Sequence, residues 1–113
     1  MLTQPYQDCI DACQACGVAC DNCLEADLRE TDHLPMLADC IRLNRDCSKL
    51  CYMAVTFMAS DSPFAHQVCD LCAQVCDACA EECEKHAQKH DHCRACAEAC
   101  RRCAEACRNM MAA

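Results

Sequence analysis

Cysteine is the residue type whose number and spacing could support chemistry in this sequence. The chain has 113 residues and 18 cysteines, well above the level at which cysteine content becomes diagnostic. Thiolate sulfur is a soft ligand, so free cysteines in this number point to Cu(I), Zn(II) or iron–sulfur clusters. The candidate metal ligands are Cys9, Cys13, Cys16, Cys20, Cys23, Cys40, Cys47, Cys51, Cys69, Cys72, Cys76, Cys79, Cys83, Cys93, Cys96, Cys100, Cys103 and Cys107.

The cysteines fall into four groups, and within three of them the intervals alternate strictly between three and four residues. This is the repeat of one face of an α-helix, whereas a strand would place same-face residues two apart. Residues 93–99 and 100–106 also form a heptad repeat, CRACAEA and CRRCAEA, with cysteine at both core positions. The stripes predict helices over residues 5–28, 33–59, 63–87 and 92–110.

Residues typical of helix starts lie at the beginning of each predicted helix. The expected caps and first-turn prolines are Thr3 or Gln4 with Pro5, Thr31 or Asp32 with Pro35, Ser62 with Pro63, and Asp91. The connections between helices are short, so neighbouring helices should run antiparallel. We therefore expect an all-α fold, an antiparallel up-down-up-down four-helix bundle with a cysteine-lined core, forming a single domain over residues 1–113.

Disulfides and simple core packing are two alternative explanations of the cysteine stripes. Cysteines one helical turn apart have Cβ atoms about 5–6 Å apart, whereas a disulfide needs about 3.8 Å, so only cross-helix disulfides would be unstrained. A buried free cysteine behaves as a small apolar residue, but alanine, valine or leucine would pack better and would not oxidise. We therefore favour metal binding over both.

Among the soft metals, Cu(I) fits a continuous stripe best. Zinc prefers closed tetrahedral sets of four ligands, and the stripe offers no division into fours. Iron–sulfur clusters are usually held by loop cysteines at a few fixed spacings. Cu(I) accepts two or three thiolates, so CxxxC pairs such as Cys9 and Cys13 would form two-coordinate sites within one helix. One Cu(I) per thiolate leaves the core nearly neutral, which predicts roughly one copper ion per cysteine.

The two ends of the predicted bundle differ in chemistry. The stripe of the second helix is His33, Met36, Cys40, Leu43, Cys47, Cys51, Ala54 and Met58. One end gathers candidate ligands other than cysteine, namely His33, Met36, His86, His90 and His92, beside Asp27 and Glu30. The other end carries Leu2, Tyr6, Phe57, Met58, Phe64 and Met110, with His66 nearby. We expect copper to enter at the histidine end and a hydrophobic plug to close the other.

Composition argues against several other classes of protein. The formal net charge is −8, whereas a nucleic-acid-binding surface needs a basic face. The first residues lack the basic and apolar regions of a signal peptide, and no run approaches the roughly 18 apolar residues of a membrane span. We therefore expect a cytosolic protein without membrane contact, whose thiols stay reduced. The cysteines offer no unique nucleophile with a paired general base, so we expect no enzyme activity.

The cysteine pattern resembles the bacterial copper storage proteins of the cytosolic branch. The resemblance rests on CxxxCxxCxxxCxxC at 9–23, CxxxC at 47–51, and CxxCxxxCxxCxxxC at 69–83 and 93–107. It implies a four-helix bundle with Cu(I) packed along the core, copper entering at one histidine-rich end, and a homotetramer. The second helix departs from a full stripe, with Leu43 where a cysteine would stand.

The expected function is storage and detoxification of Cu(I) in the cytosol, with small molecules or chaperones as copper donors. Two alternatives stay open: a broad thiolate buffer for Zn(II) or Cd(II), and a thiol redox buffer. Loading stoichiometry separates them, because tetrahedral thiolate sites would saturate near about four to eight ions, well below one ion per thiol. A redox buffer would form reversible disulfides and bind no metal tightly.

Overall fold

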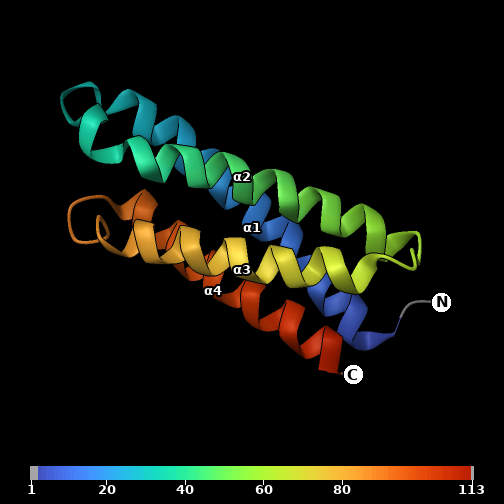
Figure 1. Cartoon of the computed structure of the whole chain (residues 1–113). Coiled ribbons are helices and arrows are strands. Elements are labelled where there is room, and N and C mark those ends of the chain that lie inside the picture. The colour runs from blue at the N-terminus through green and yellow to red at the C-terminus, as the bar shows by residue number, and fades with distance from the viewer. Residues whose placement is uncertain (1–2, 113) are drawn as a thin grey trace.

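The computed structural model describes residues 3–112. Its helices are α1 (Gln4–Arg29), α2 (Leu34–Ala59), α3 (Ala65–Glu84) and α4 (Asp91–Ala112), with a short 3-10 helix, η1 (Thr31–His33), before α2. Neighbouring helices run antiparallel, and the bundle measures 48 × 19 × 17 Å. In Figure 1 the α1–α2 and α3–α4 connections lie at one end, and the α2–α3 connection lies at the other with both termini. The predicted all-α four-helix bundle is confirmed.

The start of α1 follows the expected capping pattern. The Tyr6 N–H donates a hydrogen bond to Thr3 Oγ1 at 3.4 Å, and Pro5 lies in the first turn. Proline is well suited to this place because its missing N–H would have no partner there. Of the two expected caps, Thr3 is therefore the correct one.

The starts of α2 and α3 differ from the prediction. Thr31 and Asp32 do not cap α2 but form η1, since the His33 N–H donates to the Glu30 carbonyl at 2.9 Å and continues the turn that follows α1. Pro35 does lie in the first turn of α2. Before α3, Ser62 Oγ accepts a hydrogen bond from the Phe64 N–H at 3.1 Å, which closes a separate turn. The helix then begins at residue 65 rather than 63.

The connection from α3 to α4 is longer than predicted. Helix α3 ends at Glu84 instead of residue 87, and residues 85–89 form successive turns. The His86 N–H donates to the Cys83 carbonyl, and the His90 N–H donates back to the His86 carbonyl, each at 3.0 Å. These bonds fix both histidines over the end of the bundle. Asp91 is the first residue of α4 rather than the residue before it.

The core is built almost entirely from cysteine and alanine. All 18 cysteines have an exposed fraction of 0% and are free thiols. Small alanines such as Ala80 and Ala104 are buried beside them, and such short side chains allow helices to approach closely. On the surface, Arg101 pairs with Asp77 and Glu84, and Arg108 also pairs with Asp77, so these ion pairs join α4 to α3. Within residues 3–112, no helix is long and apolar enough to cross a membrane.

Candidate metal site

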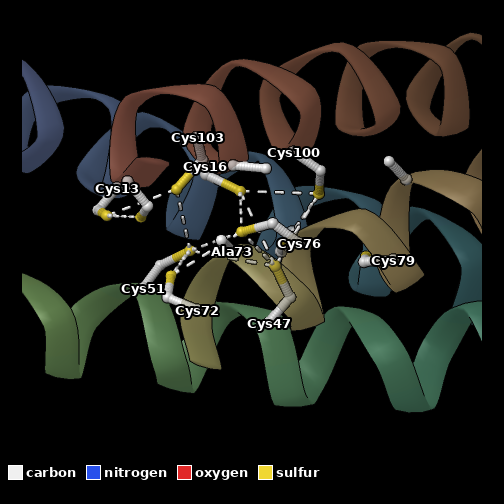
Figure 2. Packing of buried hydrophobic residues seen from close by; sticks show 14 of the residues in the cluster. Cys13, Cys16, Cys47, Cys51, Cys72, Ala73, Cys76, Cys79, Cys100 and Cys103 are labelled. Atoms are coloured by element: carbon white, nitrogen blue, oxygen red, sulfur yellow. Dashed lines mark hydrogen bonds between the residues drawn. The ribbon is translucent and has the colours of Figure 1, made fainter. Parts of the chain in front are cut away.

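The thiols of the inner core form a continuous network of sulfur atoms. Figure 2 shows side chains from all four helices turned toward one another along the bundle axis. The shortest Sγ–Sγ distance joins Cys103 to Cys13 at 3.4 Å, and other neighbouring pairs, such as Cys13 and Cys107, lie 4.0 Å apart. Groups of four sulfurs within 4.8 Å of one another include Cys13, Cys72, Cys103 and Cys107; Cys16, Cys20, Cys47 and Cys100; Cys16, Cys47, Cys51 and Cys76; Cys20, Cys79, Cys96 and Cys100; and Cys51, Cys72, Cys76 and Cys103. The core could therefore hold metal ions at many overlapping positions.

Sulfur atoms on different helices lie at least as close as those within one helix. The intrahelical pair Cys9 and Cys13 is separated by 3.9 Å. In contrast, Cys47 and Cys76 on facing helices are 3.5 Å apart, as are Cys9 and Cys107. Two-coordinate copper sites can therefore form between helices as readily as within the CxxxC pairs that the sequence suggested.

Hydrogen bonds between neighbouring thiols, together with burial, raise the pKa of most of the core thiols. Hydrogen bonding to Cys103 and burial both raise the pKa of the Cys51 thiol. Hydrogen bonding to Cys16 and burial do the same for the pKa of Cys100. Burial raises a thiol pKa because the ionised form loses its hydration. A metal ion that enters the core must therefore displace protons from sulfur.

An outer group of four thiols, Cys23, Cys40, Cys83 and Cys93, lies between the inner network and the histidine end. Cys40 and Cys83 are 3.5 Å apart, and Cys93 lies 3.6 Å from the carboxylate of Asp27. Hydrogen bonds from Cys40, Cys83 and Cys93 lower the pKa of the Cys23 thiol, against the opposing effect of burial.

The gap in the cysteine stripe of α2 is filled by Asn44, not by Leu43 as expected. Asn44 is fully buried, whereas Leu43 lies half-buried at the flank of the core. The seven residues from Cys40 to Cys47 are close to two helical turns, so positions 43 and 44 both lie near the core-facing side of the helix. The structure turns position 44 inward and leaves position 43 at the flank.

Asp27 is a second polar residue in the core, next to the histidine end. It is fully buried, and its Oδ1 lies 2.8 Å from Nε2 of His92 and within hydrogen-bonding distance of the thiols of Cys23 and Cys93. Its Oδ2 has no hydrogen-bond partner among residues 3–112. Burial is the main cause of a raised Asp27 pKa, opposed by the hydrogen bonds that it accepts.

Three of the predicted histidines gather at one end of the bundle. The ring centroids of His33 and His90 are 5.6 Å apart, and those of His90 and His92 are 5.2 Å apart. His86 is held separately by Glu82, with Nε2 3.0 Å from Oε2. A pocket of about 80 Å³ lies between these residues, and its lining is His33, Met36, Leu37, His86, Lys89 and His90.

Met36 and the plug residues are arranged differently from the prediction. Met36 is 58% exposed at the rim of the pocket, and Leu37 takes the buried position in its place. At the opposite end, Met58 and Met110 are fully or almost fully buried and close the core. Phe64 is 60% exposed and is no part of this plug, because the turn before α3 carries it outward. Leu2 lies outside the described residues.

Sequence reasoning did not assign a role to Asp27 or find Asn44. Asp27 lies four residues after Cys23, so its place on the stripe was visible, but its contact with His92 depends on how the start of α4 meets the end of α1. Asn44 continues the stripe from Cys40 at a helical interval, but so does Leu43, so the spacing alone does not choose between them.

Comparison with known proteins identifies similar sequences. A model of the family described as copper storage protein matches residues 2–112. The cysteine-rich protein YhjQ of Bacillus subtilis is 48% identical over 73 residues, which make up 64% of this chain and 66% of that protein. The matched segment thus spans just under two thirds of this relative.

Solved structures share the fold over nearly the whole chain. The Cu(I)-bound copper storage protein BsCsp3 of Bacillus subtilis is 48% identical and superposes with a TM-score of 0.89, covering 96% of this chain and 99% of its own. A cytosolic copper storage protein of Streptomyces lividans, solved with five coppers, is 37% identical, with a TM-score of 0.93 and coverage of 97% of this chain and 94% of its own.

Proposed function

Because the chain belongs to the copper storage protein family, we propose that it stores Cu(I) in the cytosol as ions bound to the cysteine thiolates of the bundle core. The observation that carries this function is the complete burial of all 18 cysteines around one axis, with sulfur–sulfur distances of 3.4 to 4.0 Å through most of the inner core. Free thiolates at this density select soft cations.

Charge and geometry favour Cu(I) over Zn(II) as the stored ion. Each transfer forms a Cu–S bond and breaks an S–H bond, and the proton leaves to the donor or to solvent without any change of oxidation state. One Cu(I) per thiolate leaves the core neutral. Zn(II) would need closed sets of four thiolates, but the groups of four share members: Cys16 and Cys51 each belong to two of them. Thiolates that bridge neighbouring Cu(I) ions fit this overlap.

Copper enters this core at the histidine end. His33, His90 and His92 form a row that leads from the surface to Asp27 and the outer thiols, and the exposed thioether of Met36 lies at its rim. Imidazole and thioether are both usable copper ligands. The ion then passes by ligand exchange to the outer group and on to the inner network. At the opposite end, the described residues form no such row, and Met58 and Met110 fill the core there.

The copper donors are small molecules or copper chaperones.

The chain works as a homotetramer. Exposed apolar side chains on three helices support association between copies: Val18 and Leu28 on α1, Tyr52 and Met53 on α2, and Leu71 on α3. Buried apolar area is the main source of stability in such contacts. Light scattering of the reduced protein should give four times the 12.5 kDa mass of one chain.

The decisive experiment is an anaerobic titration of the reduced protein with Cu(I), in competition with a chromophoric Cu(I) chelator. We expect tight uptake to continue well beyond about ten equivalents per chain and to approach one ion per thiol. A parallel titration with Zn(II) should saturate at a much lower ratio. Cu(I) uptake that stops at about four equivalents or fewer would reject the filled core and favour a zinc or redox buffer.

The same titration should be run on the variant C51S/C103S, which removes two thiols at the centre of the inner network. The two Sγ atoms are 3.9 Å apart and belong to a common group of four. We expect the variant to bind about two Cu(I) ions fewer and to keep the helical content of the parent. A loss of all uptake would show instead that copper binds at one small cluster.

A further inference from the structure

Glu82 is a largely buried carboxylate in the last turn of α3, and it contacts a histidine of the pocket. Its Oε2 accepts a hydrogen bond from His86 Nε2, and its Oε1 accepts one from Lys85 Nζ, each at 3.0 Å. The side chains of Glu82 and His86 are each 13% exposed. The other glutamates of this turn differ, since Glu84 pairs with α4 and Glu81 is exposed. Negative charge near the C-terminal end of a helix is unfavourable, so helix stability does not explain a largely buried carboxylate here.

The contact with Glu82 determines which nitrogen of His86 carries the proton. A glutamate is ionised at neutral pH, and an ionised carboxylate only accepts hydrogen bonds. The hydrogen between Glu82 and His86 therefore belongs to Nε2. In a neutral imidazole only one nitrogen carries a hydrogen, so Nδ1 keeps a free lone pair. A metal ion binds histidine through such a lone pair.

His86 belongs to the pocket and is attached to the outer group of thiols. It is one of the residues that line the pocket, and its backbone N–H donates to the carbonyl of Cys83 at 3.0 Å. The Sγ atom of Cys83 lies 3.5 Å from that of Cys40, also in the outer group. The backbone of His86 is thus fixed by Cys83 and its ring by Glu82. A histidine of the pocket is therefore held in place beside the first thiols that copper meets.

Resting on the proposed function, we propose that Glu82 is a positioning residue for copper entry, which holds the His86 ring with its proton on Nε2 so that Nδ1 binds incoming Cu(I). Metal-binding histidines usually donate their other ring N–H to a carboxylate, which fixes the tautomer and makes the ligating nitrogen more basic. Cu(I) moves from its donor ligand to Nδ1 without a proton transfer or a change of oxidation state. The thiols, in contrast, must each lose a proton when they bind the ion. His86 can therefore accept copper before any thiol is deprotonated.

The test variant is E82Q, with E81Q as the matched control on the same helical turn. Glutamine has nearly the size of glutamate, but its amide donates as well as accepts, so it no longer selects one tautomer of His86. We expect E82Q to take up Cu(I) from a chelated donor about tenfold more slowly than the parent, the smaller of the losses that changes around metal ligands usually cause. Its final capacity should be unchanged because all 18 cysteines remain. E81Q should load like the parent.

Two further measurements separate positioning from a purely structural role. Because Glu82 acts through His86, E82Q should slow uptake in the parent and have no further effect in an H86A background. The imidazole ¹⁵N chemical shifts of His86, identified by their absence in H86A, report the tautomer directly. We expect Nε2 to be protonated and Nδ1 unprotonated in the empty parent, and both tautomers to be populated in E82Q. Circular dichroism checks that each variant keeps its helices.

Three results would overturn the proposal: a parent whose His86 carries its proton on Nδ1, an E82Q protein with the parent's rate of uptake, or equal slowing by E82Q with and without His86. Each is read in protein that fills well beyond about four Cu(I) ions per chain. Failure of the parent to reach that level rejects the copper-storage function itself, and the final capacity distinguishes this outcome from the other three.

Discussion

Nε2 of His92 lies 2.8 Å from Oδ1 of Asp27, a contact between the first turn of α4 and the last turns of α1. Asp27 is fully buried while the His92 side chain is 22% exposed, so the pair spans the boundary between the thiol core and solvent. Oδ2 of the same carboxylate has no hydrogen-bond partner in the described part of the chain. The charged form of Asp27 is therefore only half satisfied by its surroundings.

Replacing Asp27 by asparagine should stabilise the empty protein at neutral pH. Burial raises the pKa of Asp27 above its ordinary value of 3.8, so stability falls as the pH rises from that value through the folded-state pKa. D27N removes this loss while keeping an acceptor for His92. We expect the free energy of unfolding to be higher in D27N than in the parent at pH 7, because the parent must keep a buried carboxylate charged at that pH.

The same gain should vanish below about pH 3, where the carboxyl is protonated in both the folded and the unfolded chain. Urea unfolding of the parent and of D27N at pH 7 and at about pH 3 measures both differences. A D27N protein that is less stable than the parent at pH 7 would contradict this account of Asp27.

Copper should raise the unfolding temperature of the protein. The folded bundle brings its sulfurs within 4.8 Å of one another in groups, so Cu(I) binds the native state more tightly than the unfolded chain. A single site at one hundred times its dissociation constant adds about 2.7 kcal/mol, and many sites add more. Anaerobic calorimetry at several copper ratios checks this, and a transition that stays in place would argue against binding in the core.

Removing two histidines at the pocket should slow copper uptake without lowering capacity. In H86A/H90A the outer and inner thiols are intact, but the pocket between α2 and the α3–α4 connection loses two of its lining ligands. We expect the rate of copper uptake from a chelated donor to fall about tenfold. This is the smaller of the losses in metal affinity or activity that mutations around a metal site usually cause. H66A is the control because His66 is exposed on α3 near the other end. Equal slowing in both variants would exclude a defined opening at the histidine end.

Gly17 should resist substitution only while Tyr52 is present. A Cβ atom at Gly17 would lie 2.6 Å from a ring carbon of Tyr52 across the α1–α2 interface. We expect G17A to cost about 1–3 kcal/mol, as overpacking usually does. In a Y52A background the same change should be neutral or stabilising by up to about 1 kcal/mol, because alanine favours a helix over glycine. A double-mutant cycle from urea unfolding gives the coupling, and equal effects in both backgrounds would refute the contact.

The sequence predicted the features that depend on periodicity alone. Cysteines spaced by three and four residues define one face of a helix, and all of them are buried as expected. Where the pattern has an interval of seven, between Cys40 and Cys47, two residues competed for the core position. The prediction that Leu43 takes this position was wrong, because helical periodicity fits Leu43 and Asn44 equally well.

Helix ends and contacts between distant segments were less predictable. Ser62 and Thr31 are typical capping residues, but each lies in a tight turn whose backbone hydrogen bonds shift the start of the following helix. Met36 was predicted to continue the core stripe, but Leu37 is the buried residue of that turn. The conformation of η1 and the start of α2 decides which of the two faces inward. The Asp27–His92 contact required the register of α4 against α1, which no local pattern contains.

The plug formed by Met58 and Met110 affects how long each stored copper ion stays bound. If copper enters and leaves only at the histidine end, as proposed above, the ions that bind last are the first to leave. Ions bound beside the histidines would then be replaced with every rise and fall in supply, whereas ions next to Met58 would leave only after all the others. Loading first with ⁶³Cu and then with ⁶⁵Cu should therefore return the heavier isotope first when a chelator withdraws copper.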